Sequence, residues 1–163
     1  MNTDLMFSSK SDNHTTPRDL FDQLNREFSF DWDAAATKEN ALVSHGAYFG
    51  PDHYAPHCRD GLEVQWFCQG WTWCNPPYGR ALPAWTRKAA HEKVAHGASS
   101  VLLVPARTET RWWRNYVANG ADEIRFMHGR LKFSGAKNSA PFPSAIVIYR
   151  PKIVGPYTWW RAK

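Results

Sequence analysis

Residues 70–79 read GWTWCNPPYG, a short aromatic run that ends in an asparagine and two consecutive prolines. The prolines exclude a helix interior, because each one removes an amide donor and fixes its own φ, and the residue before a proline is also pushed out of the α region. We therefore predict a strand over 70–73 that delivers the chain into a stiff, extended loop. A loop that carries the amide of Asn75 and the phenol of Tyr78 is either a rigid turn or a recognition device.

Upstream of this loop the sequence predicts one helix and one strand. Thr16 and Pro17 are typical of a helix start, with Thr16 as the N-cap and Pro17 at the first helical position. Residues 30–33, FDWD, indicate a short strand that ends at a run of alanines, and 38–58 is loop-like with at most a brief strand at 47–49. Apolar residues at helical spacing form one face of the helix: Leu20, Phe21, Leu24 and Phe28.

Downstream of the loop, helical and strand patterns alternate. Residues 82–96 are amphipathic and predict a helix that stops at Gly97. The apolar run 100–104 has two apolar faces, which suits an interior parallel strand. A second helix is expected at 110–119, with Trp112 and Trp113 half in the core and half on the surface, and two late strands are expected at 123–126 and 145–149.

The alternation of strands and helices in 163 residues predicts a single α/β domain around a mostly parallel sheet with a late antiparallel pair. We expect a polar N-terminal tail at 1–15, the domain at 16–155 and a C-terminal tail at 156–163. In such sheets, ligands bind outside the carboxyl ends of the strands. The turn after Asp33 and the loop at Asn75 both follow strand ends of this kind.

Composition restricts the function classes. The formal charge of +5 suits a polyanionic partner without establishing one, and nine tryptophans suffice for a core and for stacking on unpaired bases. No apolar stretch approaches the ~18 residues of a membrane helix, and no signal-peptide core precedes the domain, so a cytoplasmic protein is expected. His53, His57 and Cys58 are crowded, but their spacing matches no common zinc site, so no metal is expected.

The Asn-Pro-Pro-Tyr loop predicts a particular chemistry. The exocyclic amino group of adenine is a poor nucleophile, because its lone pair is delocalised into the ring. Two carbonyl acceptors on that NH₂ would favour a nitrogen with a usable lone pair, and the Asn75 side chain and the Pro76 carbonyl can be those acceptors. The prolines, Pro76 and Pro77, keep the acceptors aimed, and the Tyr78 ring offers a face for stacking. No strong general base is required, since the amine becomes acidic once it is alkylated.

This loop resembles the catalytic motif of amino-group S-adenosylmethionine methyltransferases. The wider chain resembles the phage-type DNA N6-adenine methyltransferase (Dam) family, which implies a compacted Rossmann-like sheet, DNA as the partner and no obligate protein partner. The tetrapeptide alone is moderately specific, because RNA and protein-glutamine methyltransferases share it. The ordered set of segments is much more specific and covers nearly the whole chain: TPRDLFDQLN at 16–25, FDWDAAAT at 30–37, DGL at 60–62, WCNPPYG at 73–79, VPARTETRWW at 104–113, GRLKF at 129–133 and APFPSAIVIYRP at 140–151.

The resemblance implies a role for each matching segment. Asn75 to Tyr78 would hold and stack a target adenine that has left the duplex. Phe133 would form a second wall for that base, and the cations Arg107, Arg130 and Lys132 would lie near phosphate. The residues implied in binding S-adenosylmethionine are Thr16, Pro17, Asp33, Ala34, Ala35 and Asp60.

Two features depart from the family pattern. The turn after Asp33 is AAAT instead of a glycine-rich loop, and only 27 residues separate Asp33 from Asp60, too few for the usual strand and helix between these motifs. The acid that would bind the cofactor ribose is therefore open, with Glu39 as the candidate. From the residues alone, Asp33 can also be a helix N-cap and Asp60 a plain turn residue.

The leading hypothesis is site-specific transfer of a methyl group from S-adenosylmethionine to adenine N6 in DNA. Methylation of RNA or of a protein glutamine by the same loop is the rival within the enzyme class. A non-catalytic nucleic-acid-binding protein that keeps a relic fold is the alternative from another class. No separate recognition domain is visible, so short loops within 45–69 and 105–142 would have to read the DNA, and a GATC preference rests on the family name alone.

Overall fold

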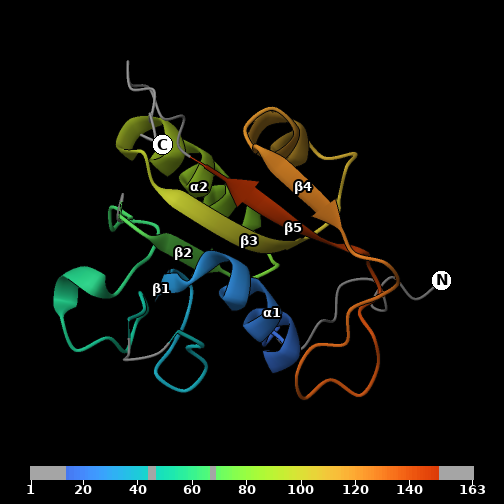
Figure 1. Cartoon of the computed structure of the whole chain (residues 1–163), viewed down its shortest axis with the longest axis horizontal. Coiled ribbons are helices and arrows are strands. Elements are labelled where there is room, and N and C mark those ends of the chain that lie inside the picture. Colours follow the sequence, from blue (N-terminus) through green and yellow to red (C-terminus); the bar gives the residue numbers. More distant parts are fainter. Residues whose placement is uncertain (1–13, 44–46, 67–68, 151–163) are drawn as a thin grey trace, which may run out of the picture.

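One five-stranded mixed sheet forms the centre of the computed structural model, which describes residues 14–43, 47–66 and 69–150 (Figure 1). The strands lie in the order β1-β2-β3-β5-β4. Parallel pairs join β1 to β2 and β2 to β3, whereas β5 pairs antiparallel with both β3 and β4. The first four strands therefore run in one direction and β5 runs against them, which confirms the predicted α/β sheet and its late antiparallel pair. The strands are β1 (Phe30–Asp33), β2 (Trp71–Cys74), β3 (Ser99–Pro105), β4 (Glu123–Phe126) and β5 (Ser144–Tyr149).

The two long helices cover opposite faces of this sheet (Figure 1). On one face, the α1 ring of Phe28 lies 4.6 Å from that of Trp71, and the α1 ring of Phe21 lies 5.8 Å from that of Trp73. On the other face, α2 packs against η4, β3 and β5. The helical elements are α1 (Arg18–Phe28), η3 (Pro56–Cys58), α2 (Leu82–His96) and η4 (Trp113–Ala118).

The prediction for Trp112 and Trp113 was wrong, because both indole rings are buried. The segment from Trp113 to Ala118 is a π-type helix instead of a regular α-helix. Its wider turn reduces the angle between successive side chains, so two adjacent tryptophans can both face the core. The prediction for 82–96 was accurate, since α2 spans Leu82–His96 and ends at Gly97, which has a φ of 67°.

The start of α1 differs from its prediction. Pro17, not Thr16, occupies the N-cap position, and no side chain caps the helix. The hydroxyl of Thr16 instead accepts a hydrogen bond from the Asn75 side chain, 59 residues away. The predicted tail also ends earlier, because Thr15 accepts a 2.9 Å hydrogen bond from the backbone of Ser134. The other positions assigned to tails, 1–13 and 156–163, lie outside the described residues, as do 151–155.

A backbone segment at 47–50 lies beside the end of β1, where the sequence allowed a brief strand. It forms a single parallel bridge between Asp33 and Tyr48. A Cβ on Gly50 would lie 1.7 Å from the carbonyl oxygen of Ala36, so the two backbones approach as closely as only glycine permits. Gly61 approaches the same turn, with its Cβ position 2.0 Å from the Ala34 oxygen. The turn after Asp33 contains no glycine, and the close backbone contacts to it come from glycines in two other loops.

Candidate active site

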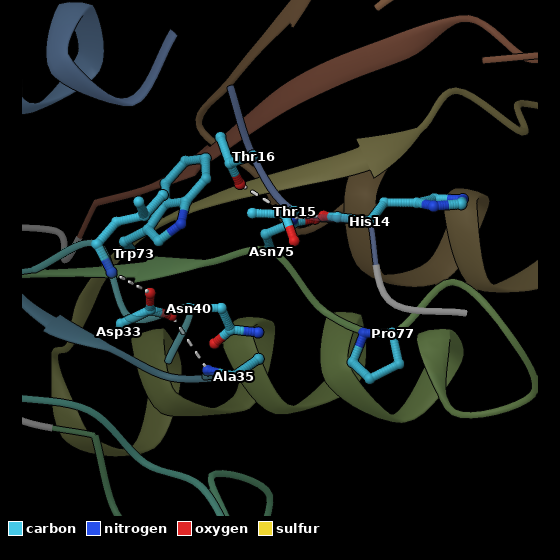
Figure 2. A pocket seen from close by; sticks show the side chains of 10 residues that line it. His14, Thr15, Thr16, Asp33, Ala35, Asn40, Trp73, Asn75 and Pro77 are labelled. Atoms are coloured by element: carbon cyan, nitrogen blue, oxygen red, sulfur yellow. Dashed lines mark hydrogen bonds between the residues drawn. The ribbon is translucent and has the colours of Figure 1, made fainter. Parts of the chain in front are cut away.

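The carboxyl ends of the parallel strands meet at one edge of the sheet, and two adjoining cavities open there. Asp33 closes β1 and Asn75 follows β2. The first cavity has a volume of about 40 Å³, and the second has a volume of about 220 Å³. Ala35, Asn40 and Pro77 line both, so the two cavities form one continuous site. Figure 2 shows Asp33, Ala35 and Asn40 on one side of the first cavity, with Thr16 and Asn75 on the other.

The Asn75 side chain is held by the segment that precedes α1. Its Nδ2 atom donates one hydrogen bond to the His14 carbonyl oxygen and another, of 2.9 Å, to Oγ1 of Thr16 (Figure 2). Its Oδ1 atom is buried and has no hydrogen-bond partner among the described residues. A buried acceptor without a partner is costly, so it is a position where an incoming donor would bind favourably.

Four aromatic rings, those of His14, Tyr78, Phe133 and Phe142, form one cluster. The rings of Tyr78 and Phe133 have centroids 5.8 Å apart at 77°, and Phe142 lies 5.6 Å from Tyr78. The His14 imidazole stacks on Phe133 at 4.7 Å. The Tyr78 hydroxyl donates to the backbone oxygen of Leu103 at 3.0 Å, and burial raises the pKa of Tyr78 well above its ordinary value. Tyr78 therefore stays neutral, and its hydroxyl anchors the ring within this cluster.

Asp33 carries the one strongly perturbed carboxyl of the described site. It is 3% exposed and accepts two long backbone hydrogen bonds, both of 3.4 Å, from Ala35 and Leu42. Burial raises its pKa to about 7, and the two N–H donors only partly oppose that rise. Within the described ranges, no cation pairs with it. Because no helix directly follows β1, the reading of Asp33 as a helix N-cap was wrong.

Asp60 lies on the wall of the second cavity. Its Oδ1 atom accepts a 2.8 Å hydrogen bond from the backbone of Leu62, so it also makes the plain turn that the sequence allowed. Glu39 is exposed and lines neither cavity, whereas its neighbour Asn40 lines both. The apolar part of the wall comes from Phe49, Pro51, Pro77 and Trp85.

The family model for DNA N-6-adenine-methyltransferase (Dam) matches residues 4–158. The chain belongs to this family. Over 152 residues it is 26% identical to the DNA N-6-adenine-methyltransferase of Haemophilus phage HP1 (strain HP1c1), a match that covers 88% of this chain and 82% of that protein. Over 111 residues it is 29% identical to the DNA N-6-adenine-methyltransferase of Escherichia phage T1, which covers 68% of this chain and 42% of that protein.

For this member of the Dam family, six of the fourteen sequence-predicted site residues line the two cavities. Thr16, Asp33 and Asn75 line the first cavity, and Asp60 lines the second. Ala35 and Pro77 line both, whereas Pro17, Ala34, Pro76 and Tyr78 line neither. Ala34 instead fixes the turn, since its N–H donates to the Trp73 carbonyl at 2.8 Å.

The predicted DNA-contacting residues of this family member divide into one buried ring and three exposed cations. Phe133 is 5% exposed and contacts the Tyr78 ring. Arg107, Arg130 and Lys132 are exposed, and none of them forms an ion pair in the part of the chain that the structure describes. The segment of Arg107 is tied to the β4–β5 connection by a 2.8 Å hydrogen bond from Ala106 to Pro143.

Sequence reasoning missed His14, Asn40 and Phe142. His14 was assigned to the tail, and no local pattern distinguishes Asn40 or Phe142 from loop residues. The crowded His53, His57 and Cys58 do not form a metal-binding group: His53 is buried and its Nδ1 accepts from the backbone of Ala55 at 3.0 Å. Among the described residues, no helix is long and apolar enough to cross a bilayer.

Proposed function

We propose that this chain transfers a methyl group from S-adenosylmethionine to the N6 amino group of an adenine in DNA. The observation that carries this proposal is the state of the Asn75 amide, with Nδ2 bonded to two acceptors and a buried Oδ1 that has no partner among the described residues. Such an oxygen is suited to accept a hydrogen bond from an incoming amino group. Membership of the Dam family supports adenine in DNA over RNA or a protein glutamine.

The fold supports the same proposal. Strands β1, β2, β3 and β4 run in one direction, and β5 is inserted against them between β3 and β4. We propose that this sheet is a compacted Rossmann-like methyltransferase fold. The compaction falls between Asp33 and Asp60, where the 47–50 segment supplies a single bridge beside β1.

The donor set of the two cavities fits S-adenosylmethionine, which supplies a methyl group on a positively charged sulfur when it is bound. The Asp33 carboxylate would bind the ammonium group, since a buried carboxylate requires a cation partner. Asp60 would accept a hydrogen bond from the adenine amino group, and the apolar walls of Phe49 and Trp85 suit the adenine ring. Asn40, which lines both cavities, is placed better than Glu39 to bind the ribose.

The protein would contribute alignment and two acceptors to the transfer. Asn75 Oδ1 and the Pro76 carbonyl would accept both N–H groups of the target amine, which localises its lone pair toward the methyl carbon. Tyr78 would offer one face to the base, and Phe133, whose ring meets that of Tyr78 at 77° with centroids 5.8 Å apart, would contact the edge of the base, so that an in-line approach costs little further entropy. As the nitrogen–carbon bond forms, the carbon–sulfur bond would break with its electron pair left on sulfur, which gives S-adenosylhomocysteine. The methylated amine would then carry a positive charge and release a proton to solvent, so no strong base is needed.

The substitution Asn75→Ala tests this function. Labelled S-adenosylmethionine would be incubated with the protein and with separate DNA, RNA and protein substrates, and the site of any label in DNA would be mapped by sequencing. We expect label in DNA adenine only, and Asn75→Ala to lower the rate by about 100-fold or more. Cofactor affinity, measured by calorimetry, should change little.

An exposed asparagine that follows η4, Asn119, provides the matched control, and Asn119→Ala should keep the wild-type rate. Full activity of Asn75→Ala would contradict the role of its amide. Label in RNA or protein instead of DNA would contradict the substrate. No binding of S-adenosylmethionine at all would favour the non-catalytic alternative.

A further inference from the structure

Residues at the start of the described chain set the orientation of the Asn75 amide. Its Nδ2 atom faces two oxygens, the His14 carbonyl and the Thr16 hydroxyl. Rotation of the amide by 180° would place Oδ1 against the His14 carbonyl, so that two acceptors would face each other. The same rotation would move the NH₂ group to the buried position that Oδ1 now holds, where it would have no acceptor among the described residues. The segment at 14–16 therefore selects one of two side-chain orientations.

This choice decides whether the amide can assist methyl transfer. An amide oxygen that faces the target amine accepts its N–H and helps to localise the lone pair on nitrogen. If the NH₂ group of Asn75 faced the target amine instead, two hydrogen-bond donors would face each other, and the lone pair of the target nitrogen would not be localised. A change in orientation would therefore remove the function of Asn75 without removing the residue.

We propose that Thr16 is a positioning residue for methyl transfer, which holds the Asn75 amide with Oδ1 toward the target amino group. The His14 carbonyl, which can only accept, disfavours the rotated amide, and the Thr16 hydroxyl, which is 2.9 Å from Nδ2 in a side chain 3% exposed, holds the amide beside that carbonyl. The place of Thr16 is fixed from the other side by Ser134, whose Oγ donates to the Thr16 carbonyl at 3.2 Å. Ser134 also donates from its backbone to Thr15 at 2.9 Å, next to the aromatic wall at Phe133.

This inference rests on the proposed function, and it assigns Thr16 a role that differs from the cofactor contact implied by the family resemblance. The two roles make different predictions. A positioning residue affects the rate of the transfer step at saturating cofactor. A cofactor contact affects the affinity for S-adenosylmethionine.

The test compares Thr16→Val with Thr16→Ser. Valine keeps the shape of threonine without the hydroxyl, whereas serine keeps the hydroxyl. Single-turnover methylation of DNA, at saturating enzyme and S-adenosylmethionine, reports the transfer step, and calorimetry reports cofactor affinity. We expect Thr16→Val to slow the single-turnover rate by about tenfold, the value of one lost hydrogen bond, with cofactor affinity within about twofold of wild type. Thr16→Ser should recover most of the rate.

Thr86 provides a control for the loss of a buried threonine hydroxyl. Its side chain is fully buried in α2 and bonds only to the backbone oxygens of Leu82 and Pro83 among the described residues. Thr86→Val should keep the wild-type single-turnover rate, and melting temperatures would verify that each variant is folded. A wild-type protein that does not methylate DNA would refute the proposed function itself.

With an active wild type, three results would overturn the role of Thr16. The first is a wild-type single-turnover rate for Thr16→Val. The second is a loss of cofactor affinity that accounts for the whole loss of rate. The third is a Thr16→Ser variant as slow as Thr16→Val, which would mean that the hydroxyl is not the group that matters.

Discussion

Replacement of Asp33 by asparagine should make the protein more stable and its cofactor site weaker. The wild-type carboxyl is almost fully buried, accepts two backbone hydrogen bonds of 3.4 Å and has a pKa raised by burial to about 7. Asparagine has nearly the same shape and keeps one oxygen acceptor, but it carries no charge. The substitution therefore removes the cost of a buried ionised group, and it loses one of the two 3.4 Å hydrogen bonds because the amide NH₂ cannot accept from a backbone N–H.

The size of the stability change follows from the difference between the pKa of Asp33 in the folded protein and its ordinary value. A rise from 3.8 to about 7 corresponds to about 4 kcal/mol of destabilisation when the group is ionised in the folded state. Because the folded state holds this proton more tightly than the unfolded state, stability falls as the pH rises from about 4 to about 7 and is level above that range. Asp33→Asn should therefore gain up to about 4 kcal/mol at pH 8 and little at pH 4.

The effect on the proposed cofactor contact has the opposite sign. With a pKa of about 7, about one tenth of Asp33 is ionised at pH 6 and about nine tenths at pH 8. If the ionised form binds the ammonium group, the wild-type affinity for S-adenosylhomocysteine should be about tenfold weaker at pH 6 than at pH 8. Asp33→Asn should bind more weakly at pH 8 and lose this pH dependence.

Urea unfolding at pH 4, 6 and 8 would measure the stability, and calorimetry with S-adenosylhomocysteine would measure the affinity. Asp31→Asn is the matched control, because Asp31 is an exposed acid on the same strand, β1. We expect Asp31→Asn to shift the free energy of unfolding by less than about 1 kcal/mol at any of these pH values. The reasoning is refuted if Asp33→Asn is no more stable than wild type at pH 8. It is refuted equally if the wild-type affinity does not change between pH 6 and pH 8.

Two further predictions concern the DNA side of the site. Phe133→Ala should slow methylation of DNA by up to about 150-fold, the upper value for one base–aromatic contact, while cofactor affinity stays the same. Single-turnover assays check this, and Phe133→Leu, which keeps an apolar side chain, should lose less. Lys132→Ala should weaken DNA binding and reduce the slope of log affinity against log salt concentration by about one, as expected for one lost phosphate contact. Titrations at several salt concentrations measure this slope. An unchanged slope would place Lys132 away from phosphate.

The sequence predicted most of the fold because the signals for it are local. Two prolines after an aromatic run define the end of β2, and Gly97 defines the end of α2. The apolar run of β3 marks a strand that is buried along its whole length. Local patterns of this kind depend on residues a few positions apart, so they can be read without knowledge of the tertiary structure.

The parts that could not be predicted depend on residues far apart in the chain. Thr16 has the ordinary signature of an N-cap, but its hydroxyl is used by an amide 59 residues away. The turn after Asp33 lacks glycines, and Gly50 and Gly61 supply the close approach from other loops. Asn40 lies in an ordinary loop, and only the folding of that loop brings it to both cavities. None of these relations produces a periodicity or a spacing in the sequence.

The order of the parallel strands explains how a chain this short can hold both substrates of the proposed reaction. At the carboxyl edge, β1 ends in Asp33, β2 leads into Asn75 and β3 leads into Arg107. The acid proposed for the cofactor, the amide proposed for the reacting nitrogen and a cation proposed for phosphate therefore follow one another across three neighbouring strands. An in-line transfer requires the cofactor and the target base to lie on opposite sides of the transferred methyl group. The middle strand of the three, β2, leads into the amide proposed to hold the reacting nitrogen, between the residues proposed for the cofactor and for phosphate. Because β1 is an edge strand of the described sheet, the compaction that we propose leaves this order intact.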